Sequence, residues 1–259
     1  MPSSPSLRVQ HEVKWQLACA ARDSGALAPN AILPRSQAIN LASSHFMSRQ
    51  DDINEKMRAI LIDWLIEVHL KFKLMPETLY LTVNLIDRYL EKERIKRSQL
   101  QLVGVTAMFI ASKYEEIYAP ECRDFVYISD KAYTREQILK MEGDMLSKLN
   151  FQLTTPNALV FLKRFTKVAG ILSTPRTKTE LLANYLVELT LQDYKMLEYL
   201  PSQIAAAATY LALKTMGQTP WVRAPGPVPH PPFLVSPCPL FDEIALLHVT
   251  RLNSNVPRG

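Results

Sequence analysis

Residues 57–70 carry apolar side chains on more than one face of a predicted helix. One face has spacings of three and four residues, at Met57, Ile60, Leu61, Trp64 and Val68. A second face carries Ile62, Leu65, Ile66 and Leu70. A helix that is apolar nearly all round is buried on several sides. The stretch is therefore either the central helix of an all-α domain, or a helix with one face on the core and the other partly open as a docking groove.

Helix-start signals divide the region around this stretch into five helices joined by short connections. The expected helices span about 52–71, 76–91, 98–116, 121–129 and 134–149. The second begins at Pro76, since proline is well suited to the first position of a helix. The others include three pairs with the spacing of a capping box: Asp52 with Glu55, Ser98 with Gln101, and Thr134 with Gln137. No strand pattern interrupts them, so residues 48–153 predict an all-α domain.

A second helical series follows, over 154–219. Its helices begin at about Pro156, at the capping pair Thr177 and Glu180, and at Pro201, and Gly170 and Gly217 end the first and third. The third repeats the small-residue pattern of Gly104, Ala107 and Ala111 at an offset of about 101 positions, as Ala205, Ala208 and Ala212. Small side chains let neighbouring helices approach closely, so the helix over 98–116 is the expected centre of the first unit. The repeated pattern indicates two copies of one helical unit.

The second copy is predicted to be incomplete. Nine of the 18 prolines lie between Pro220 and Pro257, where only Phe241–Leu252 predicts a helix. An apolar face such as that of Ile204–Leu213 is then expected to be exposed. At the other end, residues 1–47 are weakly patterned, with one short helix predicted over Gln10–Ala21.

Composition and motif content argue against several functions. The net charge is +5, with 30 basic residues dispersed among 25 acidic ones, so no clustered basic surface for nucleic acid is predicted. The three cysteines lie far apart and predict reduced thiols in an intracellular protein. No apolar run reaches the roughly 18 residues of a membrane span. The five histidines have no ligand spacing and the seven glycines form no phosphate loop, so no catalytic residue, metal or cofactor is expected.

The sequence resembles the cyclin family in its mitotic, B-type form. The resemblance begins with Met-Arg-Ala-Ile-Leu-Ile-Asp-Trp-Leu-Ile-Glu-Val at residues 57–68 and continues over 79–90, 100–104 and 111–120. It fades after about Trp221. It implies the cyclin fold, with a divergent or disordered segment at 1–47, a five-helix N-terminal box at 48–153, a partial C-terminal box at 154–219 and a Pro-rich tail at 220–259. It also implies that the final turn of a helix preceding the box lies at His45–Ser48.

The functional implication is a non-catalytic regulatory subunit of the nucleus and cytoplasm. Such a subunit binds and activates a cyclin-dependent Ser/Thr protein kinase in G2/M control. The alternatives are a truncated cyclin that does not activate, and a cyclin-fold transcription adaptor, which predicts a basic face and a complete second repeat. A helical metabolic enzyme would need catalytic residues that the sequence does not show.

The resemblance assigns a kinase-binding site. Lys113 and Glu142 match positions that bind the backbone around the C helix of the kinase. Since lysine only donates hydrogen bonds and glutamate only accepts them, the pair can satisfy both ends of a peptide segment. The apolar residues expected to cover that helix are Leu102, Tyr114, Leu146, Phe151 and Leu153. Periodicity alone favours the interpretation of Lys113 and Glu142 as solvated surface residues, and the resemblance reverses that assignment.

Two further groups follow from the resemblance. A patch that receives Arg-x-Leu motifs of substrates or inhibitors is expected at Met57, Ile60, Leu61, Trp64, Glu67 and Gln101. The simpler interpretation makes its apolar members core residues, Glu67 a solvated residue and Gln101 a helix cap. Arg58 and Asp87 lie among apolar residues on helices that should touch, and predict a buried structural ion pair.

Overall fold

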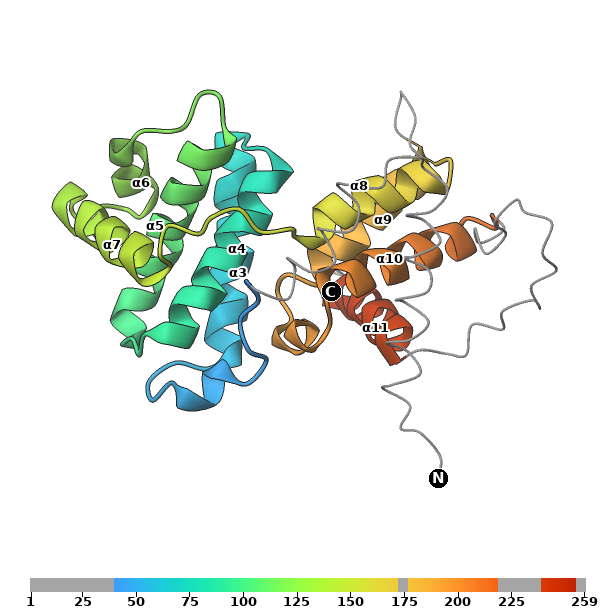
Figure 1. Ribbon diagram of the computed structural model, residues 1–259, viewed down its shortest axis with the longest axis horizontal. Helices are drawn as coiled ribbons and strands as arrows, with labels where there is room; N and C mark the ends of the chain where they lie inside the picture. Colours follow the sequence, from blue (N-terminus) through green and yellow to red (C-terminus); the bar gives the residue numbers. More distant parts are fainter. Residues whose placement is uncertain (1–39, 172–176, 219–238, 255–259) are drawn as a thin grey trace, which may run out of the picture. The chain divides into compact units, whose positions relative to one another are not determined.

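The computed structural model describes residues 40–171, 177–218 and 239–254, which form helices and connecting segments without a β-strand (Figure 1). These residues divide into two compact units. The N-terminal unit contains described residues 40–157 together with 191–199, and the C-terminal unit contains the rest. The prediction of an all-α protein is therefore confirmed for the described part of the chain.

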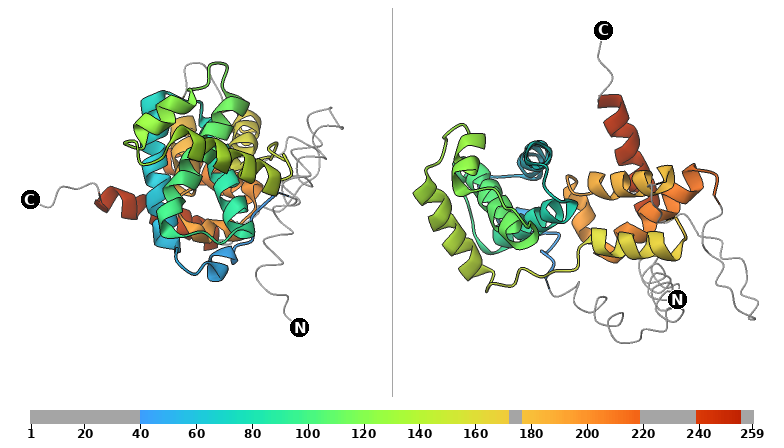
Figure 2. Two further views of the ribbon diagram at one scale, coloured as in Figure 1. Left: turned by 90° about the vertical axis from the view of Figure 1, so that its left-hand side faces the viewer. Right: turned by 90° about the horizontal axis from the view of Figure 1, so that it is seen from above.

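The N-terminal unit is built around one buried helix. Its helices are η1 (Phe46–Arg49), α3 (Glu55–Phe72), α4 (Pro76–Lys92), α5 (Arg97–Glu115), α6 (Cys122–Ile128), α7 (Arg135–Lys148) and η2 (Tyr194–Glu198). The side chains of 102–112 in α5 are all buried. Helix α5 lies between α7 on one side and α3 with α4 on the other (Figures 1 and 2). It therefore occupies the centre that its run of small residues predicted.

One glycine allows α3 to approach α5 closely. A Cβ atom added to Gly104 would lie only 2.7 Å from Cδ1 of Leu61. Leu61 is 6% exposed and fills the space that the missing side chain leaves. Gly104 thus brings the two helices together where the sequence placed small residues.

Two of the three predicted capping boxes are wrong. The N-cap of α3 is Asn54, whose Oδ1 accepts the N–H of Met57 at 3.0 Å. Asp52 instead accepts the backbone N–H of Arg97 at 2.8 Å and pairs with its guanidinium. The first turn of α5 therefore receives its acceptor from a residue 45 positions away, and Gln101 lies within the helix. A local spacing rule cannot detect a cap supplied by tertiary structure.

The remaining helix-start signals agree with the structure. Thr134 and Gln137 form a reciprocal capping box at the start of α7. Pro76 is the first residue of α4, and Pro201 the first residue of α10. Thr177 accepts the N–H of Glu180 at 3.1 Å at the start of α9.

The C-terminal unit contains four described helices, with α10 at its centre. They are α8 (Ala158–Val168), α9 (Lys178–Leu189), α10 (Pro201–Thr215) and α11 (Pro239–Ser254), drawn yellow to red in Figure 1. Helix α10 contacts each of the other three. Gly170 and Gly217, which follow α8 and α10, have φ angles of +69° and +65°. Such angles favour glycine and end helices, as predicted.

Helix α11 confirms the helix predicted at Phe241–Leu252 but overturns the expected exposure of α10. Ile204 is 8% exposed and Leu213 is 3% exposed. The ring of Phe241 packs on Tyr210 with centroids 4.9 Å apart, and Ile244 is fully buried. A helix from the segment predicted as a tail thus covers α10. The helix predicted over Gln10–Ala21 and the segment 220–238 lie outside the described residues.

The segment 191–199 leaves the C-terminal helices and packs within the N-terminal unit. The ring of Tyr194 meets that of Phe46 edge-on at 5.2 Å, and its hydroxyl accepts the N–H of Met47 at 2.9 Å. The turn expected at His45–Ser48 is the 3-10 helix η1, and Phe46 is fully buried. The sequence pattern did not predict this return of the chain.

Candidate functional site

Lys113 and Glu142, separated by 28 residues in the sequence, form an ion pair between α5 and α7. The Lys113 side chain is 44% exposed and that of Glu142 is 13% exposed. The ammonium also lies 4.1 Å from the centre of the Phe109 ring, a favourable cation–π position. An ammonium has three donors and a carboxylate two acceptor oxygens, so one mutual contact leaves bonding capacity for a partner.

Exposed and half-buried apolar side chains adjoin this ion pair. Tyr114, the residue after Lys113, is 47% exposed, and its hydroxyl bonds to the Thr154 hydroxyl. Leu146 lies one helical turn beyond Glu142 and is half-buried, as is Leu153. Phe151 is 71% exposed. The structure therefore gathers four of the five predicted apolar residues at one end of α5 and α7.

Leu102 is the exception among the predicted kinase-binding residues. It is 7% exposed and belongs to the hydrophobic core. It precedes Lys113 by three helical turns, which places it about 16 Å away along α5 at 1.5 Å per residue. The structure therefore does not bring Leu102 to the ion pair, and its position is explained by core packing.

Sequence reasoning missed Ile117 and Tyr118, which directly follow α5. They are 87% and 92% exposed, the largest values among the exposed large apolar residues of the described chain. The preceding residue, Glu116, fixes the start of this segment, because its carboxylate accepts the N–H of Met75 at 2.7 Å and the hydroxyl of Thr78. An Ile-Tyr pair between two acidic residues and Pro120, beyond the end of a helix, was the available signal.

The predicted docking patch has an open rim and a buried floor. Ile60 is 60% exposed, Glu67 is exposed, and Met57, Trp64 and Gln101 are half-buried. Leu61 is buried against Gly104, as described above. Ile60, Trp64 and Glu67 follow one another along one face of α3 at spacings of four and three residues. They form the accessible part of the patch.

Arg58 and Asp87 form a buried bidentate ion pair. Nε and Nη2 of Arg58 donate to the two carboxylate oxygens at 2.6 and 2.7 Å, and the side chains are 1% and 4% exposed. Nη1 of Arg58 also donates to the carbonyl oxygens of Leu191 and Gln192, both at 3.3 Å. One guanidinium thus joins α3 to α4 and holds the returning segment 191–199. This role is structural.

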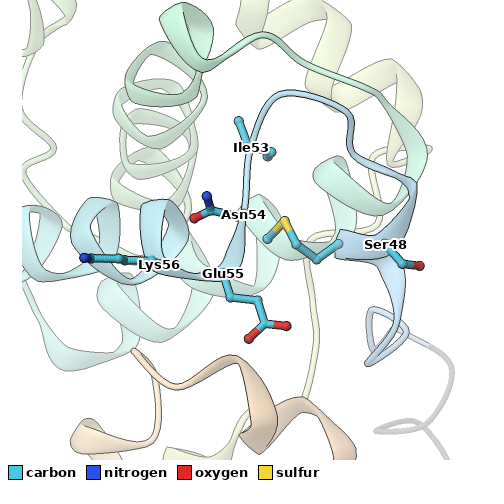
Figure 3. A pocket seen from close by; sticks show the side chains of 6 residues that line it. Ser48, Ile53, Asn54, Glu55 and Lys56 are labelled. Carbon is cyan, nitrogen blue, oxygen red and sulfur yellow. The ribbon is translucent and has the colours of Figure 1, made fainter.

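A hollow at the start of α3 contains none of the predicted site residues. It is lined by Met47, Ser48, Ile53, Asn54, Glu55 and Lys56. Figure 3 shows the side chains of Asn54 and Glu55 pointing in different directions, with no convergent set of polar groups. Among the described residues there is no cluster of His, Cys, Asp and Glu that could hold a metal, and no helix suited to cross a membrane. Burial raises the pKa of the Cys122 thiol, which makes it less reactive.

Comparison with known families identifies both units of the chain. The model of the cyclin N-terminal domain matches residues 31–154, and that of the cyclin C-terminal domain matches residues 156–224. Helix α11 lies beyond the second match. Among solved structures, a viral cyclin from herpesvirus saimiri superimposes with a TM-score of 0.67 over 73% of this chain and 82% of its own, at 20% identity. That similarity confirms the fold.

The sequence relatives are mitotic cyclins. A G2/mitotic-specific cyclin-1 from Medicago sativa subsp. varia is 53% identical over 188 residues, covering 72% of this chain and 43% of the relative. A G2/mitotic-specific cyclin-B from Hydra vulgaris is 52% identical over 181 residues, covering 70% of this chain and 49% of the relative. The chain thus spans less than half the length of these relatives. With both domain models matched in order, the chain belongs to the cyclin family, in its mitotic B-type branch.

Proposed function

We propose that the chain is a non-catalytic regulatory subunit that binds and activates a cyclin-dependent Ser/Thr protein kinase in G2/M control. The observation that carries the proposal is the Lys113–Glu142 ion pair, set beside exposed apolar side chains at the ends of α5 and α7. The names of the relatives, G2/mitotic-specific cyclins, support the timing. We also expect the chain to act in the nucleus and cytoplasm.

The composition of this face suits a helix with one apolar side. Tyr114 and Phe151 present exposed rings, and Leu146 and Leu153 add half-buried aliphatic surface. Contiguous exposed apolar surface rimmed by charges is typical of a protein-binding site. In the proposed complex these side chains cover the apolar face of the kinase C helix. That contact turns the helix inward, so that its glutamate pairs with the ATP-binding lysine of the kinase.

The Lys113–Glu142 ion pair would orient the kinase on this face. In the free chain Lys113 and Glu142 bond to each other. On binding, the ammonium donates to backbone carbonyl groups of the kinase and the carboxylate accepts backbone N–H groups, so that both charges stay paired as water leaves. Buried charges that lose a partner are costly, so removing either residue should weaken the complex.

Ile117 and Tyr118 extend the proposed contact surface beyond α5. Their side chains are almost fully exposed, while Glu116 anchors the backbone before them to the start of α4. A fixed backbone that presents two large apolar side chains loses little conformational entropy when a partner covers them. We place these residues in the same kinase-binding face as Tyr114.

The open face of α3 is the proposed docking site for substrates or inhibitors with Arg-x-Leu motifs. Ile60 and Trp64 would contact the leucine, with buried Leu61 as the floor, and Glu67 would pair with the arginine. Gln101, on the neighbouring α5, would hydrogen-bond the peptide backbone. A Trp64→Ala variant should lose such peptides in a fluorescence titration while retaining the kinase.

The decisive experiment measures binding and activation of a purified cell-cycle kinase by the whole chain. The variant carries Lys113→Ala and Glu142→Ala. The control carries Lys56→Ala and Glu55→Ala, a Lys/Glu pair at the exposed start of α3 and outside the proposed face. We expect the site variant to weaken binding by about tenfold or more, as for interface hot spots, and the control to leave it unchanged.

The outcomes separate the proposal from its alternative. Binding with phosphorylation of a histone substrate, both lost in the site variant, supports a kinase-activating subunit. Binding without phosphorylation identifies a cyclin that does not activate. Equal loss in the site and control variants would show that the Lys113–Glu142 pair is not the contact. A soluble, helical chain that binds no cell-cycle kinase would overturn the proposed function.

A further inference from the structure

Phe151 owes its exposure to an unusual backbone turn. Helix α7 ends at Lys148, and the next residues reverse direction with Asn150 at φ +52° and Phe151 at φ +56°. Two successive left-handed residues without a glycine are uncommon, and for a bulky residue such as phenylalanine the conformation is unfavourable. Interactions elsewhere must therefore stabilise the turn.

Part of that stabilisation is local. The N–H of Phe151 donates to the carbonyl of Leu146 at 2.9 Å, and the N–H of Gln152 donates to that of Leu149 at 3.0 Å. The side chain of Leu149 is 1% exposed and anchors the turn in the core. These bonds are those of an ordinary helix end and do not by themselves select the left-handed conformation at Phe151.

Further contacts come from one face of α4. Arg88 donates from Nη1 to the carbonyl oxygen of Gln152 at 2.8 Å. Lys92, one helical turn further along α4, donates to the carbonyl oxygen of Lys148. Two cations thus hold backbone carbonyls on either side of the turn, where the end of a helix carries partial negative charge.

Arg88 is placed for this role by burial. It is only 6% exposed, and burial lowers the pKa of its guanidinium. Within the described chain it forms no ion pair, and its other bond is a long one to Asn84, at 3.3 Å. A buried charge is retained at a cost unless hydrogen bonds compensate it. The short bond to the Gln152 carbonyl is the strongest compensation that Arg88 has, so the turn and the guanidinium stabilise each other.

We propose that Arg88 is a positioning residue for partner binding: its bond to the Gln152 carbonyl holds the 149–153 turn so that Phe151 faces the kinase. Arg88 itself is buried and acts only through the turn. The inference rests on the proposed function, since it concerns the same kinase-binding face. It adds that part of the face is preorganised from α4, which lowers the entropy that binding must overcome.

The test is a double-mutant cycle in the whole chain. Arg88→Met keeps the apolar stem and removes the donors, and Phe151→Ala removes the side chain that the turn presents. We expect Arg88→Met to weaken kinase binding about tenfold, equivalent to about 1.4 kcal/mol. In the Phe151→Ala background the same change should cost less than about twofold, because the side chain it positions is gone. A parallel cycle with Lys113→Ala should retain the full tenfold effect.

Hydrogen exchange on the free chain gives a second readout that does not depend on the kinase. Arg88→Met should raise exchange of amides 149–153 and leave peptides from α5 unchanged. Arg88→Lys, which keeps the charge but lacks the planar fork, should be intermediate in both measurements and replaces Arg88→Met if that variant does not fold.

Three results would overturn the inference: equal losses of affinity with and without Phe151, exchange that rises throughout the unit, or exchange that is unchanged at 149–153. If the unaltered chain binds no kinase, the proposed function fails. The exchange measurement still decides whether Arg88 holds the turn.

Discussion

Removing the buried Arg58 side chain should destabilise the N-terminal unit more than any surface substitution. Arg58→Met removes both short bonds to Asp87 and both longer bonds to the carbonyls of Leu191 and Gln192. Asp87 is left as a carboxylate with a 4% exposed side chain and no cation. Breaking a buried ion pair in this way typically costs about 3–5 kcal/mol. That is a large part of the roughly 5–15 kcal/mol available to a folded domain.

Removing the other partner, Asp87, should cost less free energy of unfolding. In Asp87→Leu the Arg58 guanidinium keeps its bonds to the two carbonyls, and Cζ of Arg58 lies 5.9 Å from the centre of the Tyr194 ring. These contacts compensate part of the cost of burying the cation, whereas Asp87 forms no comparable second bond within the described part of the chain. We expect Asp87→Leu to be less destabilising than Arg58→Met by about 1 kcal/mol, the usual contribution of a hydrogen bond.

The double variant is the critical one. Arg58→Met with Asp87→Leu removes both charges and leaves a pair of apolar side chains of similar total volume. Replacing a whole buried pair is often close to neutral, so the remaining loss is that of the two long bonds to Leu191 and Gln192. The double variant should therefore be more stable than Arg58→Met alone. Urea unfolding of the three variants, followed by far-UV circular dichroism, measures each free energy. Additive losses in the double variant would refute the electrostatic argument.

Three other perturbations test separate parts of the fold. Gly104→Ala should lower thermal stability despite its better helix propensity, because the new Cβ would lie 2.7 Å from Leu61, and Leu61→Ala should reverse the sign of that effect. Burial, with the bond to Asp144, raises the pKa of Tyr89. The protonated hydroxyl therefore contributes its full stabilisation below the ordinary pKa of about 10, and this stabilisation is lost as the pH rises toward the raised pKa. Tyr89→Phe should thus reduce the alkaline loss of stability seen in unfolding between pH 8 and pH 11. Thr134→Ala, which removes the cap of α7, should cost about 1 kcal/mol, measured by urea unfolding.

The positions of the helices were predictable because each signal is local. Pro76 and Pro201 begin their helices, and the reciprocal bonds of Thr134 and Gln137 lie within four residues. The small residues of α5 also predicted a central helix, because side-chain size, which the sequence gives directly, determines how closely neighbouring helices can approach. These features depend on neighbours within one turn of the chain.

Features that depend on distant partners were not predictable in the same way. Ser98 has the correct spacing for a cap, but the first turn of α5 takes its acceptor from Asp52. Leu102 carries an apolar side chain on the same helix as Lys113, but it lies three turns away and in the core. The return of 191–199 depends on donors from Arg58, which no pattern around Leu191 reveals. In each case, a neighbour that is distant in the sequence determines where the residue lies, and no local pattern identifies that neighbour.

Core packing places the proposed kinase-binding face at the ends of helices. In the middle of α5 every side chain is committed to packing, so only the ends can present apolar groups without opening the core. A backbone that is held in place at such an end keeps the exposed apolar group in one position, which lowers the entropy cost of binding. Glu116 holds the segment that presents Ile117 and Tyr118, and Arg88 holds the turn that presents Phe151. Both anchors are polar side chains bonded to backbone groups at least 41 residues away in the sequence. In the proposed complex the exposed residues would provide the contact. The anchors, which a hydrophobic pattern cannot identify, would determine where that contact lies.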